Sequence, residues 1–140
     1  HQGFADAIAQ SENLHLLTFC PADWREELAE TKMDSLLRLY PHIDYLYAQN
    51  DRMGSGALKA IKRAGRQGIN IIGVDALLQE GAGVDLVRKG EFLATHLYPT
   101  GGSEAILLAK KILQGEPFER FTELPTAMVD STNARVMQLQ

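Results

Sequence analysis

The sequence predicts an α/β fold, a three-layer, doubly wound arrangement around a mostly parallel sheet. Short apolar runs rich in β-branched and aromatic residues alternate along the chain with segments of helical periodicity. Pro, Gly and Asn punctuate the junctions between these segments. Because helices of about ten residues between strands form right-handed crossovers, the strands should run parallel and be covered on both faces.

The chain opens with a predicted helix and a predicted strand. Residues 1–9 are expected to be helical because Phe4 and Ile8, with the alanines between them, share one face. Residues 14–19 form the apolar run Leu-His-Leu-Leu-Thr-Phe, and Pro21 follows it closely. This run is predicted to be a short strand.

A second helix and strand follow. Asp23 stands three residues before Glu26, a spacing similar to that of a capping box, and predicts a helix that ends at Pro41. Residues 43–49 then read as a strand, and residues 53–64 as the helix after it. The strand therefore leads directly into a helix through a polar junction.

The remaining elements repeat this order as far as residue 113. Strands are expected at residues 69–74 and 92–98, with a short helix near residues 84–87 between them. Residues 105–113 form a strongly periodic helix. The stretches 120–124 and 127–129 resemble strands without a following helix.

Composition indicates one globular domain and argues against nucleic-acid binding. A chain of 140 residues that is 45% hydrophobic can close a single core. The net charge is −4, and the Lys and Arg residues are scattered along the chain, so no basic binding surface is expected. Cys20 is the single cysteine, which rules out an intrachain disulfide. The sequence shows no signal peptide or apolar membrane span and starts within a helix, so it is expected to be a piece of a larger protein.

Polar and aromatic residues follow successive predicted strands and should share one edge of the sheet. Trp24, Asn50, Asp75 and Tyr98 lie at these positions, and ligands of open α/β sheets bind there. Aromatic rings can stack on the C–H faces of a sugar, and amide and carboxylate groups can bind its hydroxyls. Each residue also has a structural alternative, such as packing for the aromatics and a turn for Asn50. Asp51 is predicted to cap the helix that follows it.

Other chemical interpretations find little support. Gly54 and Gly56 lack the third glycine of a dinucleotide loop, and close packing of the helix on the sheet explains them better. The four histidines lack metal-ligand spacing, so no metal site is expected. Cys20 has no histidine placed to activate it and is predicted to be an inert thiol. No acid–base pair is evident, so neither catalytic residues nor a cofactor is predicted.

At the polar junction the chain resembles a known family. Segment 47–65 contains Ala-Gln-Asn-Asp, and segment 71–75 is the strand end Ile-Ile-Gly-Val-Asp. Both segments are similar to the type I periplasmic sugar-binding proteins of the ribose-binding branch. Further matches in order and spacing are found at residues 3–4, 21–24, 102–105 and 112–116. The resemblance runs nearly end to end and implies a Rossmann-like lobe that closes on a sugar.

The resemblance implies a role for each candidate residue. Trp24 corresponds to a ring-stacking aromatic, Asn50 and Asp75 to residues that bind sugar hydroxyls, and Tyr98 to the polar residue at the last strand end. Ala76 stands where the family has glycine, and Tyr98 where it usually has glutamine. These departures indicate that the sugar differs from that of the ribose-type proteins.

The resemblance also divides the chain. Residues 1–100 correspond to the second lobe of a sugar-binding domain. Residues 101–140 correspond to a crossover helix with a C-terminal strand and tail, which in the family returns between the lobes. The first lobe would then be a partner outside this sequence, and a second copy of the chain is another candidate partner for the apolar face of the helix.

Two functions from different classes are consistent with this resemblance. Residues 80–87 and 95–102 are similar to the periplasmic sensor halves of hybrid two-component regulators of carbohydrate use. They imply a non-enzymatic, membrane-anchored periplasmic sugar sensor, with a transport receptor as its close neighbour and a kinase outside this region. The alternative is the effector-binding lobe of a repressor of the lactose-repressor type. Residues 67–71 lack the Pro-Asp segment usual in those repressors, which favours the sensor.

Overall fold

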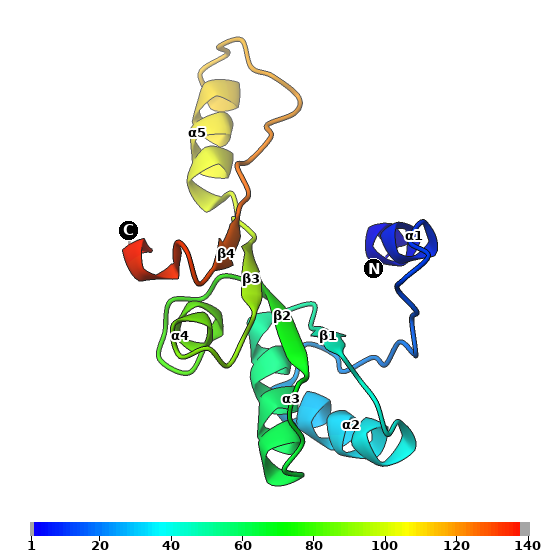
Figure 1. Ribbon diagram of the computed structural model, residues 1–140. Helices are drawn as coiled ribbons and strands as arrows, with labels where there is room; N and C mark the ends of the chain where they lie inside the picture. Colours follow the sequence, from blue (N-terminus) through cyan, green and yellow to red (C-terminus); the bar gives the residue numbers. More distant parts are fainter. Residues whose placement is uncertain (1, 138–140) are drawn as a thin grey trace.

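The computed structural model describes residues 2–137 and contains a four-stranded sheet with strand order β1-β2-β3-β4 (Figure 1). The strands are β1 (Tyr45–Tyr47), β2 (Asn70–Asp75), β3 (Ala94–Leu97) and β4 (Met128–Asp130). The first three run parallel, and β4 is antiparallel to β3. The predicted mostly parallel α/β fold is confirmed.

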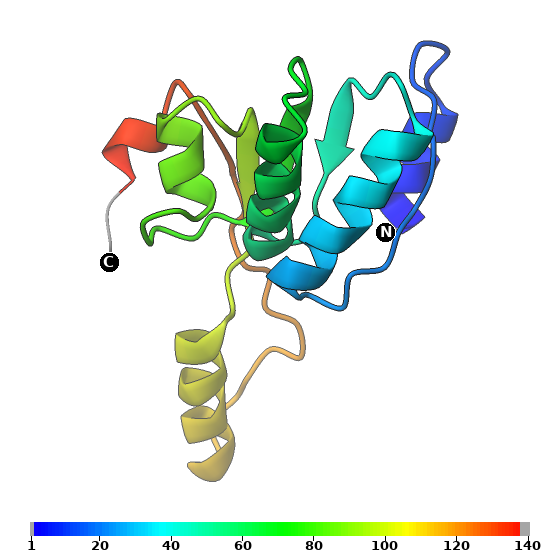
Figure 2. The same ribbon diagram turned by 90° about the horizontal axis from the view of Figure 1, so that it is seen from below.

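The helices of the described residues are α1 (Gln2–Ala9), α2 (Glu26–Leu39), α3 (Asp51–Arg63), α4 (Gly83–Arg88) and α5 (Gly102–Leu113), followed by the 3₁₀ turn η1 (Ala134–Val136). Three of these helices cover one face of the sheet. Figure 2 shows α4, α3 and α2 side by side on the same side of the strands. The core lies between α3, α4 and the sheet, where Ile71, Val84 and Val129 are fully buried.

The opposite face carries a lighter third layer. There the ring of Phe4 in α1 stacks on Tyr47 in β1, with ring centroids 4.4 Å apart. Ile72 and Val74 of β2 are only half-buried, whereas Ile71 between the helices and the sheet is buried. The two faces of the sheet are therefore covered to different extents.

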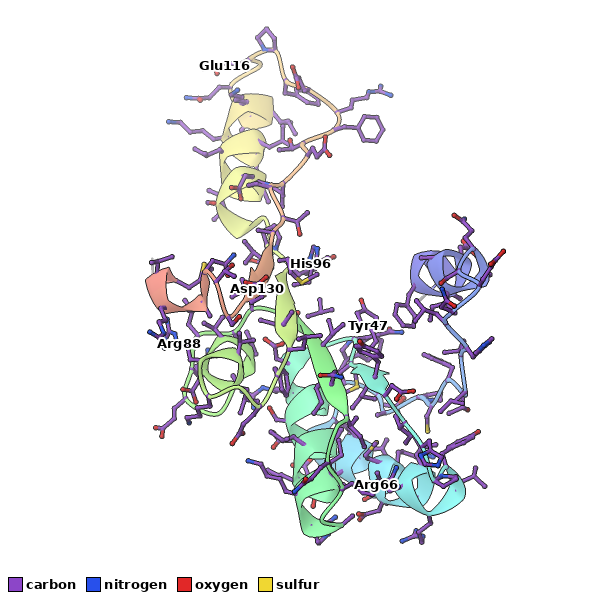
Figure 3. All side chains as sticks on the ribbon, in the orientation of Figure 1. Tyr47, Arg66, Arg88, His96, Glu116 and Asp130 are labelled. Carbon is purple, nitrogen blue, oxygen red and sulfur yellow. The ribbon has the colours of Figure 1, made fainter. Side chains whose placement is uncertain are left out.

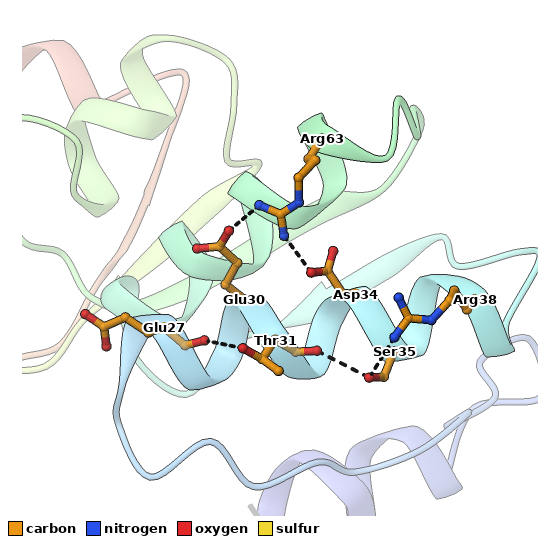
Figure 4. Close-up of polar contacts among 7 residues, drawn as sticks. All are labelled: Glu27, Glu30, Thr31, Asp34, Ser35, Arg38 and Arg63. Carbon is orange, nitrogen blue, oxygen red and sulfur yellow. Dashed lines mark hydrogen bonds and ion pairs between the residues drawn. The ribbon is translucent and has the colours of Figure 1, made fainter.

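Two glycines let α3 pack closely. A Cβ at Gly54 would lie 2.6 Å from the ring of Phe92, and a Cβ at Gly56 would lie 2.1 Å from the carbonyl oxygen of Glu26. The glycines serve close helix packing, as predicted, but the predicted contact with the sheet is not what they make: Gly54 faces Phe92, which precedes β3, and Gly56 faces the backbone of α2. Ion pairs from Arg63 to Glu30 and Asp34 tie the same two helices together (Figure 4).

The end of α2 is held by a side chain from beyond α3. The guanidinium of Arg66 donates to the carbonyl oxygens of Leu37 and Tyr40 at 3.2 Å and of Pro41 at 2.7 Å. Figure 3 shows Arg66 at the end of α3 that adjoins α2. The helix ends before Pro41, as predicted, and its last carbonyls are satisfied by this arginine.

Three local predictions were wrong. Residues 14–19 and 120–124 are not strands in the structure, because a strand exists only where a neighbour completes its hydrogen-bond ladder and these segments join none. Asp23 does not cap α2: its own φ of 49° is left-handed, and Arg25 occupies the N-cap without a side-chain bond. Residue 1 of the predicted first helix and residues 138–140 of the predicted C-terminal region lie outside the described residues.

Residues 99–127 form an arm that projects from the sheet between β3 and β4 (Figures 1 and 2). Its helix α5 confirms the predicted helix, but none of its residues, all of which the structure describes, is buried. Large apolar side chains remain exposed along it, including Ile106, Leu107, Leu113 and Phe121. The arm therefore has an apolar surface that no other part of residues 2–137 covers.

Candidate functional site

The candidate residues come together at the carboxyl edge of the sheet, called here the rim. Asn50, Asp75 and Tyr98 follow or end the parallel strands β1, β2 and β3, so they lie at the same edge. Trp24 lies just before α2, and Figure 2 shows the first turns of α2 and α3 at this same end. The predicted shared edge is thus present, and the arm leaves the sheet from the same end.

Asn50 is the N-cap of α3, which corrects the prediction for Asp51. The side-chain oxygen Oδ1 of Asn50 accepts a hydrogen bond from the backbone N–H of Met53 at 2.7 Å. Asn50 has extended backbone angles, as an N-cap requires, whereas Asp51 is already the first helical residue. The cap uses the amide oxygen of Asn50, so the amide nitrogen is the group that can donate to a ligand.

Asp51 points inward from the rim and is fully buried. Its carboxylate accepts hydrogen bonds from the hydroxyl of Thr95 at 2.6 Å and from the backbone N–H of Leu77 at 2.8 Å. Burial raises the pKa of Asp51, and these hydrogen bonds oppose the rise. Its role is to join α3, β3 and the loop after β2.

Asp75 ends β2 beside the start of α3. Its carboxylate accepts a hydrogen bond from the backbone N–H of Asp51, which lowers its pKa, while partial burial raises the pKa by more. Asn50 and Asp75 therefore share the N-terminal end of one helix. This position places an amide donor and a carboxylate acceptor next to each other on the rim.

Backbone strain accompanies two of the candidate residues. The non-glycine residues with positive φ among those described are Asp23 (49°), Trp24 (55°), Asp75 (109°) and Ala76 (54°). Conformations of this kind cost about 1–3 kcal/mol each and persist where the surrounding structure holds them, often at binding sites. The strained pairs thus contain two of the four predicted ligand residues.

The aromatic members of the rim are open to solvent. Trp24 is 71% exposed and Tyr98 is 67% exposed, so neither serves as a core residue. Exposed rings beside an amide and a carboxylate can stack on the apolar face of a sugar while the polar groups bind its hydroxyls. The surface hollows at α5 with residues 117–122 and at α1 with residues 11–16 lie away from the rim. Of the rim residues, Trp24 and Tyr98 are thus open to solvent, whereas Asn50 is buried.

Thr95 is the site residue that sequence reasoning missed. It is buried in the middle of β3, where it donates to Asp51 and accepts from the backbone N–H of Ala76 at 3.2 Å. A threonine in a strand is common, and nothing in its neighbours along the chain signals this role. Its position depends on the register in which Gly73 pairs with Thr95.

Neither a membrane helix nor a metal cluster is found among residues 2–137. No helix there is long and apolar enough to cross a bilayer. Within the same residues, no three His, Cys, Asp or Glu side chains are grouped so as to hold a metal ion.

The chain is similar in sequence and structure to sugar-binding proteins. It is 33% identical over 118 residues to a xylitol-binding protein of Mycolicibacterium smegmatis, with 82% of this chain and 33% of that protein covered. It is 32% identical over 117 residues to the ribose import binding protein of Salmonella typhimurium, with 82% and 38% covered. The chain thus spans about a third to two fifths of the length of these relatives.

A solved structure extends the similarity over nearly the whole chain. The fructose-binding periplasmic domain of a hybrid two-component system matches with a TM-score of 0.94 and 44% identity, covering 99% of this chain and 46% of that one. The description "periplasmic binding protein domain" also fits residues 1–117 as a family model. By sequence and by fold, the chain belongs to the periplasmic binding protein family.

Proposed function

We propose that this chain is the carbohydrate-binding lobe of an extracytoplasmic, non-enzymatic receptor for a mono- or small oligosaccharide. The observation that carries the proposal is the pairing of Asn50 and Asp75 at the N-terminal end of α3. Exposed Trp24 and Tyr98 at the same rim add stacking surfaces. The relatives named above bind sugars or a sugar alcohol, which supports this ligand class.

The rim supplies half of a binding site in this proposal. The chain corresponds to 46% of the fructose-binding domain, and the rim has no cover among the described residues. Residues 1–100 form the lobe, and residues 101–140 form the crossover that packs on a first lobe outside this sequence. A sugar then stabilises the closed state by contacting both lobes.

The sensor of a two-component system is the better of the two regulatory proposals. The match at 44% identity is to the periplasmic domain of such a system, and the curated relatives named above are a xylitol-binding protein and a ribose import protein. Closure of the lobes would signal to a membrane-anchored kinase or present the sugar to an uptake system. The effector lobe of a lactose-repressor-like regulator remains the alternative function.

A panel of neutral sugars tests the ligand class. The two-lobe protein is heated with each sugar, and a binder at one hundred times its Kd stabilises the folded state by about 2.7 kcal/mol. Trp24→Ala should reduce the shift because it removes a stacking face. Tyr45→Ala, which removes an exposed ring from the first residue of β1, at the strand end opposite the rim, is the control. A panel without any shift would contradict sugar binding.

Asn50 variants separate its capping role from ligand contact. Asn50→Ala removes the capping acceptor and should lower the free energy of unfolding by about 1 kcal/mol. Asn50→Asp keeps an acceptor for the N–H of Met53 and should retain stability, but it lacks the amide donor and should weaken sugar binding. Calorimetric unfolding and titration measure the two effects. Equal sugar affinity in wild type and Asn50→Asp would remove Asn50 from the ligand contacts.

A further inference from the structure

The buried carboxylate of Asp51 is surrounded by donors from three separate parts of the chain. It accepts from the hydroxyl of Thr95 in β3, from the N–H of Leu77 in the loop after β2, and from the N–H of Gly83 at the start of α4. The loop of residues 76–82 therefore has its beginning and its end attached to one side chain. An asparagine could not replace this carboxylate freely, because its NH₂ would face a donor.

Close packing leaves the carboxylate little freedom. A Cβ at Gly73 would lie 2.2 Å from Oδ1 of Asp51, and a Cβ at Gly83 would lie 2.0 Å from Oδ2. The carboxylate thus fills a space that exists only because both neighbours are glycines. Its position is determined by backbone on two sides.

The same group is linked back to the rim. Thr95 donates to Asp51 and accepts from the N–H of Ala76, whose φ is 54°. Asp75, whose φ is 109°, accepts in turn from the backbone N–H of Asp51. The two strained residues are therefore held from both sides by Asp51 and Thr95, and an alanine at position 76 does not adopt this conformation unaided.

We propose that Asp51 and Thr95 are positioning residues of the sugar site, which hold the loop of residues 76–82 so that the Asp75 carboxylate stays on the rim beside Asn50. The inference rests on the proposed sugar binding. Neither residue contacts the ligand, since both are fully buried and their side-chain oxygens are bonded to each other and to the backbone of the loop. Loss of the Thr95 hydroxyl frees the N–H of Ala76 and one oxygen of Asp51, and the strained backbone then relaxes.

The test compares three variants of the two-lobe protein at a temperature where all are folded. Thr95→Val should weaken affinity for the sugar found in the panel by about tenfold, and Thr95→Ser, which keeps the hydroxyl, should stay within about twofold of wild type. Ile61→Val is the control, because it loosens the core in the second half of α3, away from the rim. It should lower the unfolding temperature without changing affinity.

A loss of affinity in Thr95→Val no larger than in Ile61→Val would overturn the proposal. If Thr95→Val does not fold, Thr95→Ala takes its place, since a water can occupy the vacated space, and the same comparison applies. A full loss in Thr95→Ser would also contradict the role of the hydroxyl.

Amide exchange separates this inference from the proposed function. Without sugar, Thr95→Val should speed exchange at Leu77 and Gly83 by about tenfold relative to Ile61→Val, because their shared acceptor is displaced. Unchanged exchange there would overturn the inference even if sugar binds. A panel in which no sugar binds defeats the proposed function and, with it, the positioning role, whatever the exchange rates show.

Discussion

The helices α3 and α5 have similar lengths, 13 and 12 residues, and both carry apolar side chains at helical spacing, yet their surroundings differ completely. α3 buries seven residues between α2, the sheet and the loop after β2. α5, described in full, buries none and has Ile106 at 73% exposure. The comparison teaches that an amphipathic pattern predicts a helix but does not say which surface covers it.

Equivalent deletions in the two helices should have unequal effects. Ile61→Ala in α3 should lower the free energy of unfolding of this chain by about 3 kcal/mol, because the residue is 5% exposed within the core. Ile106→Ala in α5 should change it by less than about 0.5 kcal/mol. Denaturant unfolding measures both. A large loss in Ile106→Ala would mean that the arm is covered in this chain, for example by a second copy.

Glycines give a second contrast. Gly56→Ala should destabilise the chain by about 2–3 kcal/mol, because the added Cβ meets the carbonyl of Glu26 in α2. Gly102→Ala, where a Cβ would meet nothing within 4 Å, should be neutral or stabilise α5 slightly. Thermal unfolding of the two variants gives the sign of each change. Similar behaviour of both would show that α2 does not pack on α3 as described.

The Arg63 ion pairs should contribute less to the free energy of unfolding than the burial of Ile61 or the close packing at Gly56. Arg63→Ala removes the pairs with Glu30 and Asp34 and should lower the stability only slightly, and most clearly at low salt. Because the guanidinium is half-exposed, the loss should shrink in about 1 M salt. Lys110→Ala on the arm is the control and should be neutral. A loss independent of salt would indicate that the aliphatic stem of Arg63, and not its charge, holds the helices.

The pKa of a rim carboxylate, Asp75, and that of an arm carboxylate, Glu104, should be shifted in opposite directions. Burial raises the pKa of Asp75 above its ordinary 3.8. The pKa of Glu104 lies below its ordinary 4.5, because the carboxylate of Glu104 accepts hydrogen bonds from the Glu104 backbone N–H and from the Ser103 hydroxyl. Asp75 therefore favours folding fully below its unfolded pKa and loses that contribution as pH rises through its folded pKa. Glu104 behaves in reverse: its contribution is present above its unfolded pKa and is lost as pH falls through its folded pKa.

NMR titration of the two side chains checks these directions, and Asp75→Asn should remove the first pH dependence. Because an ionised Asp75 is the better acceptor for sugar hydroxyls, sugar affinity should also fall as the pH drops through its pKa in the two-lobe protein. An Asp75 midpoint below 3.8 would contradict the burial of its carboxylate.

Much of the fold follows from local pattern. The helices ending before Pro41 and at Leu113, and the strands from Tyr45 to Leu97, follow from periodicity and turn residues that act over a few positions. The segment 14–19 failed because strand formation is a property of a pair, and its apolar sequence cannot supply the partner. The rim was found from sequence because parallel strands bring their carboxyl ends to one edge.

Details of the site depended on the folded chain. Adjacent Asn50 and Asp51 are both good capping residues, and only the path of the backbone decides that Asn50 caps while Asp51 turns inward. Thr95 lies 44 residues from its partner Asp51, a separation that no local pattern can bridge. The positive φ of Asp75 and Ala76 likewise arises from the bonds that hold their loop.

By itself, the sequence determined the order of most helices and strands and the residue types at the strand ends, because these depend on short-range periodicity and on turn chemistry. The tertiary structure decided which helix is buried, which carboxylate faces the rim and which supports it, because each depends on contacts between residues distant in the chain. The exposed face of α5 and the buried face of α3 differ for this same reason.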